Sequence, residues 1–346
     1  MQVVGRLAHK LRQQFSHAAL LFGRVRLVAL VVLGLFVCAA PVSAQKYPDR
    51  TITIIVPYPA GGPTDQLARV VANALSKRFG QNFIVENVSG GGTIIATNRV
   101  AKAIPDGYTL LLHNLQISAN PSLYKTIPFD TEKDLTPVMF INRNPLVVFG
   151  RKALEANTLT ELLALMKKQR MKVAIPGYGA TGHLTTVLLE EQAGVKVDLI
   201  PYRGGAPIMT DLLGDHIDLF IGTPQQFLQH VATGQLKAFG ITDKEKSPQY
   251  PTADSFVKLL GPKLQIHYWQ ALFAPAGTPD AVIKTLNAAL EEVVVNDPAI
   301  VKIWTDTGVE AFPKDERSPD AGREIMKSEI ARWGQVVRDN NIHVDQ

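Results

Sequence analysis

Hydrophobic residues in the first third of the chain alternate between short β-branched runs and longer stretches with helical spacing. The run at 51–56 predicts a strand, and apolar residues spaced as on one helix face follow it until Gly80. A second strand is predicted at 83–86, a helix from Gly90 to about Ala103, and a third strand at 109–112. This β-α-β-α-β order predicts a parallel sheet covered by helices.

A second series with the same alternation begins after an extended segment at 139–149. It predicts strands at 172–175, 197–200, 217–221 and 236–241, one helix from about Leu184 and another ending at Leu213. The chain then returns through a predicted strand at 269–273 and helices at 281–295 and 318–340. We therefore predict two α/β lobes joined by two chain crossings, with residues 45–143 and 252–346 in lobe 1 and residues 144–251 in lobe 2.

The first 44 residues carry the features of a secretory signal peptide. Five basic residues precede an apolar run at 27–40, and Val42-Ser43-Ala44 then offers small residues for cleavage. The run is about 14 residues long, shorter than the roughly 20 that span a bilayer, so a retained anchor is the weaker alternative. Lipid attachment at Cys38 is also disfavoured, because Leu35-Phe36-Val37 lacks the expected small residue. We predict a periplasmic protein whose segment 1–44 is removed.

Removal of this segment changes what the composition implies. The net charge of +5 comes from its five basic residues, and the mature chain keeps 31 basic and 31 acidic residues. A balanced charge gives no support for nucleic-acid binding. Cys38 is the sole cysteine of the chain, so the mature protein has no disulfide, no thiol chemistry and no cysteine metal site.

Two glycine-rich turns lie between a predicted strand and a predicted helix, one at 56–65 and the other at 174–183. Backbone N–H groups at the positive end of a helix bind anions, so two such turns on separate lobes predict one small anion held between them. Either turn alone could also be a tight connection without a ligand. Thr64 or Asp65 is expected to cap the first helix. Asp65 is expected to order the loop or a water, because its charge would repel an anion.

Four segments resemble the periplasmic solute-binding proteins of the tripartite tricarboxylate transporter system, also called Bug receptors. They are Val56–Asp65, Tyr202–Gly205 with Thr210–Gly214, Phe273–Pro279 and Glu329–Gly334. The resemblance runs in order along nearly all of the mature chain. It implies a type II periplasmic binding fold with a two-strand hinge, and carboxylate ligands held by backbone amides and waters. It also implies delivery to a membrane permease with one large and one small subunit, and no cofactor.

The resemblance assigns ligand-binding positions to two loops and a turn. They are Pro59, Ala60, Gly61, Gly62 and Asp65 in lobe 1, and Gly179, Ala180, Thr181, Gly182, His183, Tyr202, Arg203 and Gly204 in lobe 2. Arg203 stands where lysine is commoner in the family, and its forked guanidinium suits a carboxylate, although a solvated surface arginine is the alternative. Tyr58 and Tyr202 either wall the pocket or pack between strand ends.

The segment His113-Asn114-Leu115-Gln116 departs from the family, which usually has Gly, Ser and Thr after the third strand. Its larger polar groups predict a different pocket size and hydrogen-bonding pattern, so His113 and Asn114 join the candidate ligand contacts. The alternative for His113 and His183 is an ordinary buried histidine. The loop at 90–92 looks like a third anion turn but is expected to be structural.

The chain contains no motif of an enzyme active site, such as G-x-S-x-G, H-E-x-x-H, a P-loop or G-x-G-x-x-G. We predict a monomeric receptor without a metal or catalytic residues. Two alternatives use the same scaffold. The closed receptor could present its ligand to a membrane sensor kinase, or the scaffold could host a periplasmic hydrolase, for which no nucleophile with an orienting partner is found.

Overall fold

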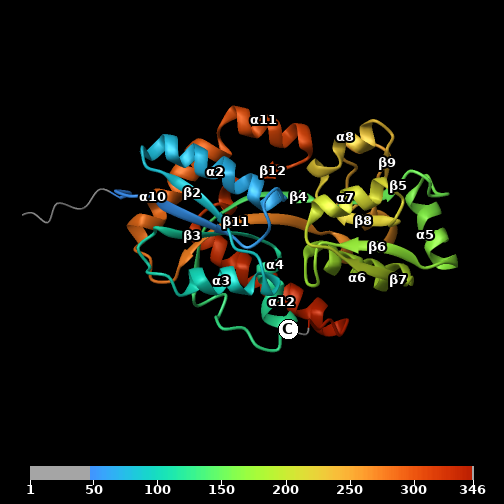
Figure 1. Ribbon diagram of the computed structural model, residues 1–346, viewed down its shortest axis with the longest axis horizontal. Coiled ribbons are helices and arrows are strands. Elements are labelled where there is room, and N and C mark those ends of the chain that lie inside the picture. Colours follow the sequence, from blue (N-terminus) through green and yellow to red (C-terminus); the bar gives the residue numbers. More distant parts are fainter. Residues whose placement is uncertain (1–46, 345–346) are drawn as a thin grey trace, which may run out of the picture. The chain divides into compact units, whose positions relative to one another are not determined.

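Two six-stranded sheets organise the computed structural model, which describes residues 47–344 (Figure 1). The first sheet has the strand order β12-β4-β11-β3-β1-β2, and the second has the order β10-β9-β5-β8-β6-β7. The first sheet takes strands from both ends of the described chain, and the second takes its strands from the middle. This arrangement confirms the predicted two-lobed α/β architecture. The exact lobe boundaries stay a prediction, and the predicted signal peptide lies outside the described residues.

The first sheet is mixed. β1 pairs in parallel with β2 and β3, whereas β11 is antiparallel to β3 and β4. Its strands are β1 (Ile52–Val56), β2 (Phe83–Asn87), β3 (Thr109–Asn114), β4 (Leu135–Pro145), β11 (His267–Pro275) and β12 (Glu310–Ala311). The helices of this part are α2 (Pro63–Phe79), α3 (Ile94–Ala101), α4 (Gln116–Leu123), α10 (Asp280–Leu290), α11 (Pro298–Thr307) and α12 (Pro319–Asp339). Because β1, β2 and β3 are parallel, the loops after them meet at one sheet edge.

The second sheet repeats this plan. β6 pairs in parallel with β7 and β8, and β5 is antiparallel to β8 and β9. Its strands are β5 (Val147–Arg151), β6 (Met171–Ile175), β7 (Val197–Pro201), β8 (Leu219–Gly222), β9 (Leu236–Ile241) and β10 (Asp254–Ser255). Its helices are α5 (Leu159–Lys168), α6 (Thr181–Ala193), α7 (Gly205–Leu213), α8 (Leu228–Ala232) and α9 (Phe256–Leu260). The short turns of both parts are η1 (Gly91–Thr93), η2 (Pro224–Gln226), η3 (Pro262–Leu264), η4 (Glu291–Val295) and η5 (Lys314–Glu316).

The chain passes between the sheets twice, and Thr242 links the two passages. β4 leads into β5 through Leu146, and the return passage runs from η3, which follows β10 and α9, through Ile266 to β11. The backbone N–H of Thr242 donates to the carbonyl of Leu146, and its carbonyl accepts the N–H of Ile266. The buried Thr242 hydroxyl accepts the N–H of Leu146 at 2.8 Å and donates to the carbonyl of Ile266 at 2.6 Å. These four bonds hold the two passages side by side.

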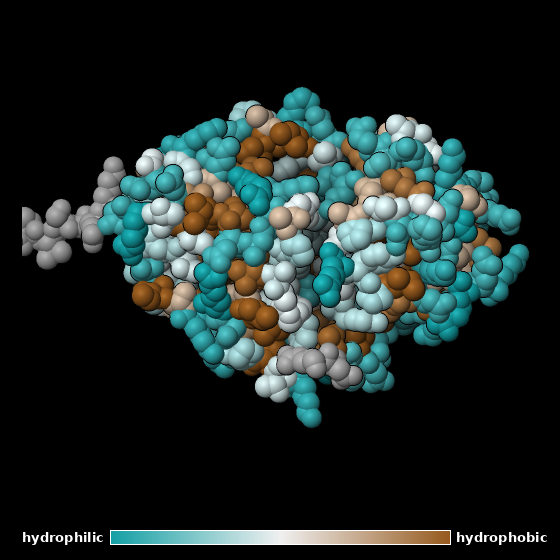
Figure 2. Space-filling model, in the orientation of Figure 1, coloured by the Kyte–Doolittle hydropathy of each residue, from teal (hydrophilic) through white to brown (hydrophobic). Residues whose placement is uncertain are grey.

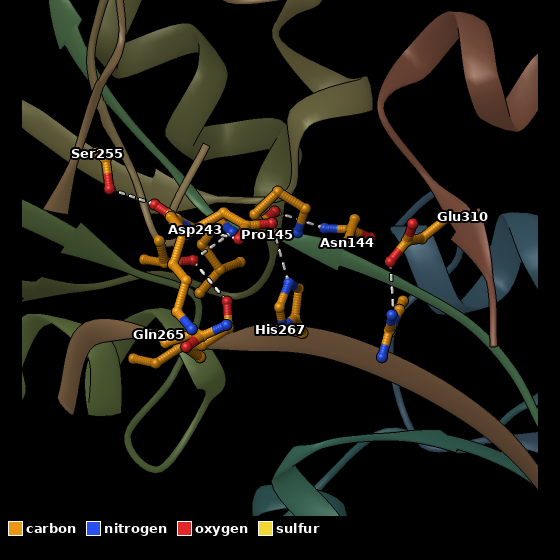
Figure 3. A network of polar contacts seen from close by, with 12 residues as sticks. Asn144, Pro145, Asp243, Ser255, Gln265, His267 and Glu310 are labelled. Carbon is orange, nitrogen blue, oxygen red and sulfur yellow. Dashed lines mark hydrogen bonds and ion pairs between the residues drawn. The ribbon is translucent and has the colours of Figure 1, made fainter. Parts of the chain in front are cut away.

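Charged side chains gather beside this junction (Figure 3). Nε2 of His267 lies 3.1 Å from Oδ2 of Asp243, and Nε of Arg143 donates to Glu310 at 2.7 Å. The hydrogen bond with His267, and more weakly the charge of Arg143, hold the pKa of Asp243 below its usual value although burial opposes this. The region where the sheets join is therefore fixed by side chains as well as by backbone.

Most apolar side chains of the strands are buried, as the hydrophobic pattern of the sequence predicts. Ile52, Ile54 and Val56 of β1 are fully buried. On the face drawn in Figure 2, hydrophobic residues form small separate groups in a largely hydrophilic surface, and one group lies over α11, which exposes Val301 and Ile303. Within residues 47–344, no helix has both the length and the apolar character that a membrane crossing needs.

Several helices differ from their predictions. α4, α5 and α11 were not predicted, and α6 begins at Thr181 instead of near Leu184. The predicted helix at 281–295 is regular only to Leu290, after which η4 continues it as a wider π-helical turn. α4 escapes the hydrophobic pattern because its polar residues are buried too, including Gln116, Ser118 and Asn120.

Candidate functional site

The loop between β1 and α2 ends in a helix N-terminus without a side-chain cap. Gly62 is the N-cap residue, and Pro63 opens the helix without an N–H of its own. The first intrahelical bond runs from the N–H of Gln66 to the carbonyl of Gly62. The N–H groups of Thr64 and Asp65 therefore have no intrahelical acceptor and lie at the positive end of the helix. Pro59, Ala60 and Gly61 form the exposed part of this loop.

Asp65 is not the N-cap that the sequence predicted. It lies in the first turn, where its Oδ2 accepts the N–H of Gly61 at 2.9 Å and Nε of Arg69 at 3.0 Å. Its Oδ1 accepts Nδ2 of Asn87 at 3.0 Å. Burial disfavours the charged carboxylate, but the bonds from Arg69, Gly61 and Asn87 outweigh it and lower the pKa of Asp65. Asp65 thus orders the loop, as expected, by binding the backbone ahead of the helix.

The loop between β6 and α6 has the same construction. Ala180 is the N-cap residue without a side-chain cap, and the N–H of Leu184 is the first to reach back, to the carbonyl of Ala180. Hence the N–H groups of Thr181, Gly182 and His183 have no intrahelical acceptor. Gly182 permits close packing on β8, because a β-carbon there would lie 2.5 Å from the carbonyl oxygen of Ile221.

His183 supports this second loop. Its Nδ1 accepts the N–H of Gly179 at 3.0 Å, so the proton of the neutral ring is on Nε2. Burial lowers the pKa of His183 to about 4. The ring of Tyr178 packs edge-on against it, with the centroids 5.4 Å apart. The structure shows that His183 is buried and orients the glycine loop, and its contact with a ligand stays a prediction.

Among the α-helices of residues 47–344, four have side-chain caps and seven do not. Thr158, Ser255, Asp297 and Ser318 cap α5, α9, α11 and α12. α2, α6 and α7 begin at Gly62, Ala180 and Gly204, none of which has a capping side chain. The loops that the sequence predicted as ligand-binding thus end in open N-termini, and α3, α4, α8 and α10 also begin without a side-chain cap.

A polar cluster joins the end of β3 to the first loop. The hydroxyl of Tyr58 lies 2.8 Å from Oδ1 of Asn114 and 3.2 Å from Oε1 of Gln116. Burial raises the pKa of Tyr58 well above its usual value, so the phenol keeps its proton. Nδ2 of Asn114 donates to Oγ1 of Thr64 in the first turn of α2. Tyr58 is therefore part of a hydrogen-bond network with Asn114 and Gln116.

His113 is fully buried beside this cluster. Its Nδ1 accepts the backbone N–H of Asn114 at 2.7 Å, and its Nε2 is buried without a partner. Nδ1 also lies 3.1 Å from the carbonyl oxygen of Asn114. Burial lowers the pKa of His113 to about 3, so the ring is neutral. The two predicted residues thus differ, because the Asn114 side chain is bonded within the cluster and Nε2 of His113 is buried without a partner.

The turn after β7 presents a free cation. Among the arginines at 47–344, Arg203 is the one whose guanidinium has no hydrogen-bond or ion-pair partner, and it is exposed. The hydroxyl of Tyr202 is taken by Asp211 at 2.6 Å, and burial followed by this bond raises the pKa of Tyr202 to about 12. Gly204 begins α7 with a φ of +102°, which favours glycine. Arg203 is therefore available to a ligand and Tyr202 is fixed to α7.

Two contacts connect the predicted loops with their surroundings. A β-carbon on Gly179 would lie 2.6 Å from Cδ1 of Leu123, so the second-lobe loop touches α4 of the first. α4 also holds the loop at 90–93, because Nδ2 of Asn120 donates to Oγ1 of Thr93 and Nε2 of Gln116 reaches the carbonyl of Gly92. The loop at 90–93 is thus bound by protein groups, in agreement with its expected structural role.

Sequence reasoning missed a set of buried polar side chains near these loops. Side-chain atoms without a hydrogen-bond partner occur on the first sheet at Asn142, Asn144 and Gln270. In the second lobe they occur at Thr181, which opens α6, and after β8 at Thr223 and Gln225. Of these six, only Thr181 was predicted. The signal in the sequence was present: Asn142 and Asn144 alternate in an otherwise apolar strand and so face the same side of the sheet.

A cavity of about 710 Å³ lies elsewhere, between α6, η3 and α12. Its charged wall residues are already paired, since Lys263 contacts Glu191 at 2.6 Å and Nε2 of Gln335 donates to Asp339 at 2.7 Å. None of the predicted site residues lines it. The open helix N-termini and unpaired polar atoms make the glycine loops the better candidate. Residues 47–344 contain no cluster of His, Cys, Asp or Glu suited to a metal ion.

Comparison with known proteins places the chain among solute receptors. The model of the family described as "Tripartite tricarboxylate transporter family receptor" matches residues 67–342. Protein BugT of Bordetella pertussis is 36% identical over 318 residues, which cover 90% of this chain and 96% of BugT. Solved periplasmic binding proteins share the two-lobed fold.

Two similar solved structures from Rhodopseudomonas palustris contain carboxylic acids. MatC (Rpa3494), described with bound malate, is 29% identical with a TM-score of 0.77, over 84% of this chain and 100% of MatC. Rpa4515, described with adipate, is also 29% identical with a TM-score of 0.79, and the match covers 86% of this chain and 100% of the Rpa4515 chain.

Proposed function

The chain belongs to the tripartite tricarboxylate transporter receptor family, and we propose that it captures a small organic carboxylate between its two lobes. Members of this family are periplasmic solute-binding proteins and not enzymes. The ligand class is a di- or tricarboxylate or an aromatic acid. The acids in MatC and Rpa4515 support this class.

The observation that carries the proposal is the pair of uncapped helix N-termini at α2 and α6. Each leaves backbone N–H groups for an anion, and a carboxylate at either end replaces the missing cap. The unpaired guanidinium of Arg203 adds a charged donor on the second lobe. Two or three charge-assisted bonds of about 1.5–3 kcal/mol each are enough for micromolar affinity, about −8 kcal/mol, after the cost of closure.

We further propose that the exported chain is a periplasmic monomer that delivers its solute to the two membrane subunits of the transporter. The family supports this use. The same closed form could instead present the solute to a membrane sensor kinase. Deletion of the permease genes distinguishes the two: it abolishes solute uptake under the transport proposal and leaves the receptor-dependent response intact under the sensor proposal.

The first test is thermal stability of the exported, purified protein, unfolded and refolded to remove carried solute. The panel contains C4–C8 dicarboxylates, citrate, acidic amino acids, benzoate and the phthalates. One subgroup is expected to raise the melting temperature by several degrees, because it binds only the folded state, and its amides or esters are expected to have no effect.

Variants at the two loops check the site. Arg203→Gln keeps a polar side chain but removes the charge, and we expect it to weaken the best ligand by about tenfold. Arg170→Gln is the matched control, since Arg170 lies on the same lobe in an exposed pair with Asp198. If no carboxylate stabilises the folded protein, the proposed ligand class is wrong. If the Arg203→Gln and Arg170→Gln proteins bind the ligand equally well, Arg203 does not contact it.

A further inference from the structure

We propose that the solute carries a hydroxyl group besides its carboxylates, and that this hydroxyl binds the buried side chains of Asn142, Asn144 and Gln270. We call these three residues the polar row. The inference rests on the proposed carboxylate function and adds the chemical class of the solute. The two relatives do not decide it, because malate has a hydroxyl and adipate has none.

The polar row continues directly from the predicted site. Gln270 on β11 pairs with Asn114 on β3 and with Asn142 on β4. Directly paired residues of antiparallel strands point to the same face, so these three amides lie side by side. Asn144 is two residues from Asn142 along β4 and shares its face. The polar row thus adjoins Asn114, which contacts Thr64 in the first turn of α2.

The spacing suits a short acid. Neighbouring strands lie about 4.8 Å apart, so Gln270 and Asn142 stand about 5 and 10 Å from the strand of Asn114. An acid whose first carboxylate meets the N-terminus of α2 would therefore place its next carbons over the polar row. The second carboxylate would then extend toward the other lobe, where α6 and Arg203 offer donors.

The atoms of the polar row lack partners although they are buried. Gln270, Asn142 and Asn144 are 1%, 3% and 0% exposed. The Oδ1 atoms of both asparagines have no hydrogen-bond partner, and Nε2 of Gln270 makes no close hydrogen bond. The hydroxyl of Tyr268, which bonds Oγ1 of Thr64, lies near enough to Gln270 for this amide to oppose the rise that burial causes in the pKa of Tyr268. The orientation of Asn144 is defined, because its Nδ2 donates to the carbonyl of Pro145 at 2.8 Å and leaves Oδ1 free (Figure 3). Buried polar atoms are normally paired, so three free ones on one face point to an absent partner.

A hydroxyl is the group that fits these atoms. It donates one hydrogen, which an asparagine Oδ1 can accept, and it accepts hydrogen bonds, which Nε2 of Gln270 can donate. An ammonium group fits less well, because the polar row is uncharged and the oxygens of Asp65 are already taken by Arg69, Gly61 and Asn87. A plain methylene leaves both kinds of atom unpaired, and sites with buried polar groups reject such analogues.

The experiment is calorimetric titration of the refolded protein with acids that differ only in one group. L-malate, succinate and L-aspartate share a four-carbon skeleton, and citrate and tricarballylate form a second pair that differs by a hydroxyl. We expect the hydroxylated member of the binding pair to bind about tenfold or more tighter than the plain member, with aspartate no tighter than succinate.

Three variants connect this preference with the polar row. Asn142→Leu and Asn144→Leu nearly preserve shape and remove the amide, so the affinity ratio between hydroxylated and plain acid is expected to fall toward one. Asn98→Leu is the matched control, because Oδ1 of Asn98 is also buried and unpartnered but lies on α3. It should leave the ratio unchanged. The ratio separates recognition from general loss of folding, which weakens both acids alike.

The outcomes are distinguishable. If plain acids bind as tightly as hydroxylated ones, or if the ratio survives both substitutions, the inference is overturned while the carboxylate receptor stands. A tighter complex with aspartate than with malate overturns the choice of hydroxyl over ammonium. If no carboxylate of the panel binds, the proposed function itself fails.

Discussion

At the scale of single residues, Asp65 shows how one carboxylate orders a binding loop. It accepts three hydrogen bonds, of which only one comes from a charged partner. We expect Asp65→Asn to lower the free energy of unfolding by about 1–3 kcal/mol, because the amide group cannot accept all three. Solute affinity should fall too, since the backbone of Gly61 loses its anchor. Urea denaturation and calorimetry check both effects.

Asp198→Asn is the control for this substitution. Asp198 pairs with Arg170 at 2.8 Å on the surface, where both side chains are half exposed. Such pairs contribute about 0–1 kcal/mol, so its loss should change little. If the Asp65→Asn and Asp198→Asn proteins lose the same free energy of unfolding, Asp65 does not order the loop.

His183 gives a pH dependence at the same scale. Its pKa is about 4 in the folded protein and about 6.5 in an unfolded chain, so the unfolded state binds more protons between these values. Stability is therefore complete above pH 6.5 and falls as the pH drops toward 4. We expect a loss of about 2 kcal/mol from His183 at pH 5 relative to pH 7.

His183→Asn tests this expectation. The amide oxygen can take the place of Nδ1 as acceptor for the N–H of Gly179, and asparagine does not titrate. Denaturation at pH 7 and pH 5 should show a smaller loss for the variant than for the natural chain. His113, with a pKa of about 3, contributes in the same direction and remains in both proteins. An equal loss in both would show that His183 is not buried in its neutral form.

At the scale of elements, the contact between α4 and the second glycine loop depends on a missing side chain. Gly179 has a φ of +77°, and a β-carbon there would lie 2.6 Å from Cδ1 of Leu123. We expect Gly179→Ala to weaken solute binding about tenfold or more, because the left-handed backbone and the collision both oppose the present contact. Adding Leu123→Ala should restore part of the affinity, since it removes the collision and leaves the backbone strain.

Gly194→Ala separates the two causes. Gly194 ends α6 with a φ of +63°, and a β-carbon there meets nothing within 4 Å. The Gly194→Ala substitution should therefore lower the free energy of unfolding through backbone strain alone and leave solute affinity unchanged. If Leu123→Ala gives no recovery in the Gly179→Ala protein, the contact does not control binding.

The sequence predicts most strands and the long helices from their apolar pattern, and it misses several shorter helices. The longer strands of both sheets follow from their apolar runs and α12 from its helical spacing, whereas the two-residue strands β10 and β12 were not predicted. α4 was missed because it buries polar residues and contains Pro121, which argues against a helix. Asp65 was assigned to the wrong capping position, because sequence cannot tell which backbone N–H a carboxylate will reach. The polar row was missed because its members pair only across strands distant in sequence.

At the scale of the whole molecule, the two sheets depend on one buried threonine. Thr242 bonds to Leu146 on the outward passage and to Ile266 on the return passage. We expect Thr242→Val to lower the free energy of unfolding by about 2–5 kcal/mol. The methyl group preserves the shape but leaves a buried N–H and a buried carbonyl without their partner, at about 1–3 kcal/mol each.

The shape of the transition tests whether Thr242 couples the halves or only adds stability. Thr278→Val removes a buried hydroxyl that makes a single bond, to the carbonyl of Pro275 at 2.7 Å, so it should shift the urea midpoint slightly at a constant slope. Thr242→Val should shift the midpoint further and broaden the transition, because the sheets then begin to unfold separately. A large shift with an unchanged slope would mean that backbone pairing alone keeps the sheets cooperative, and identical curves for the two variants would exclude a special role for Thr242.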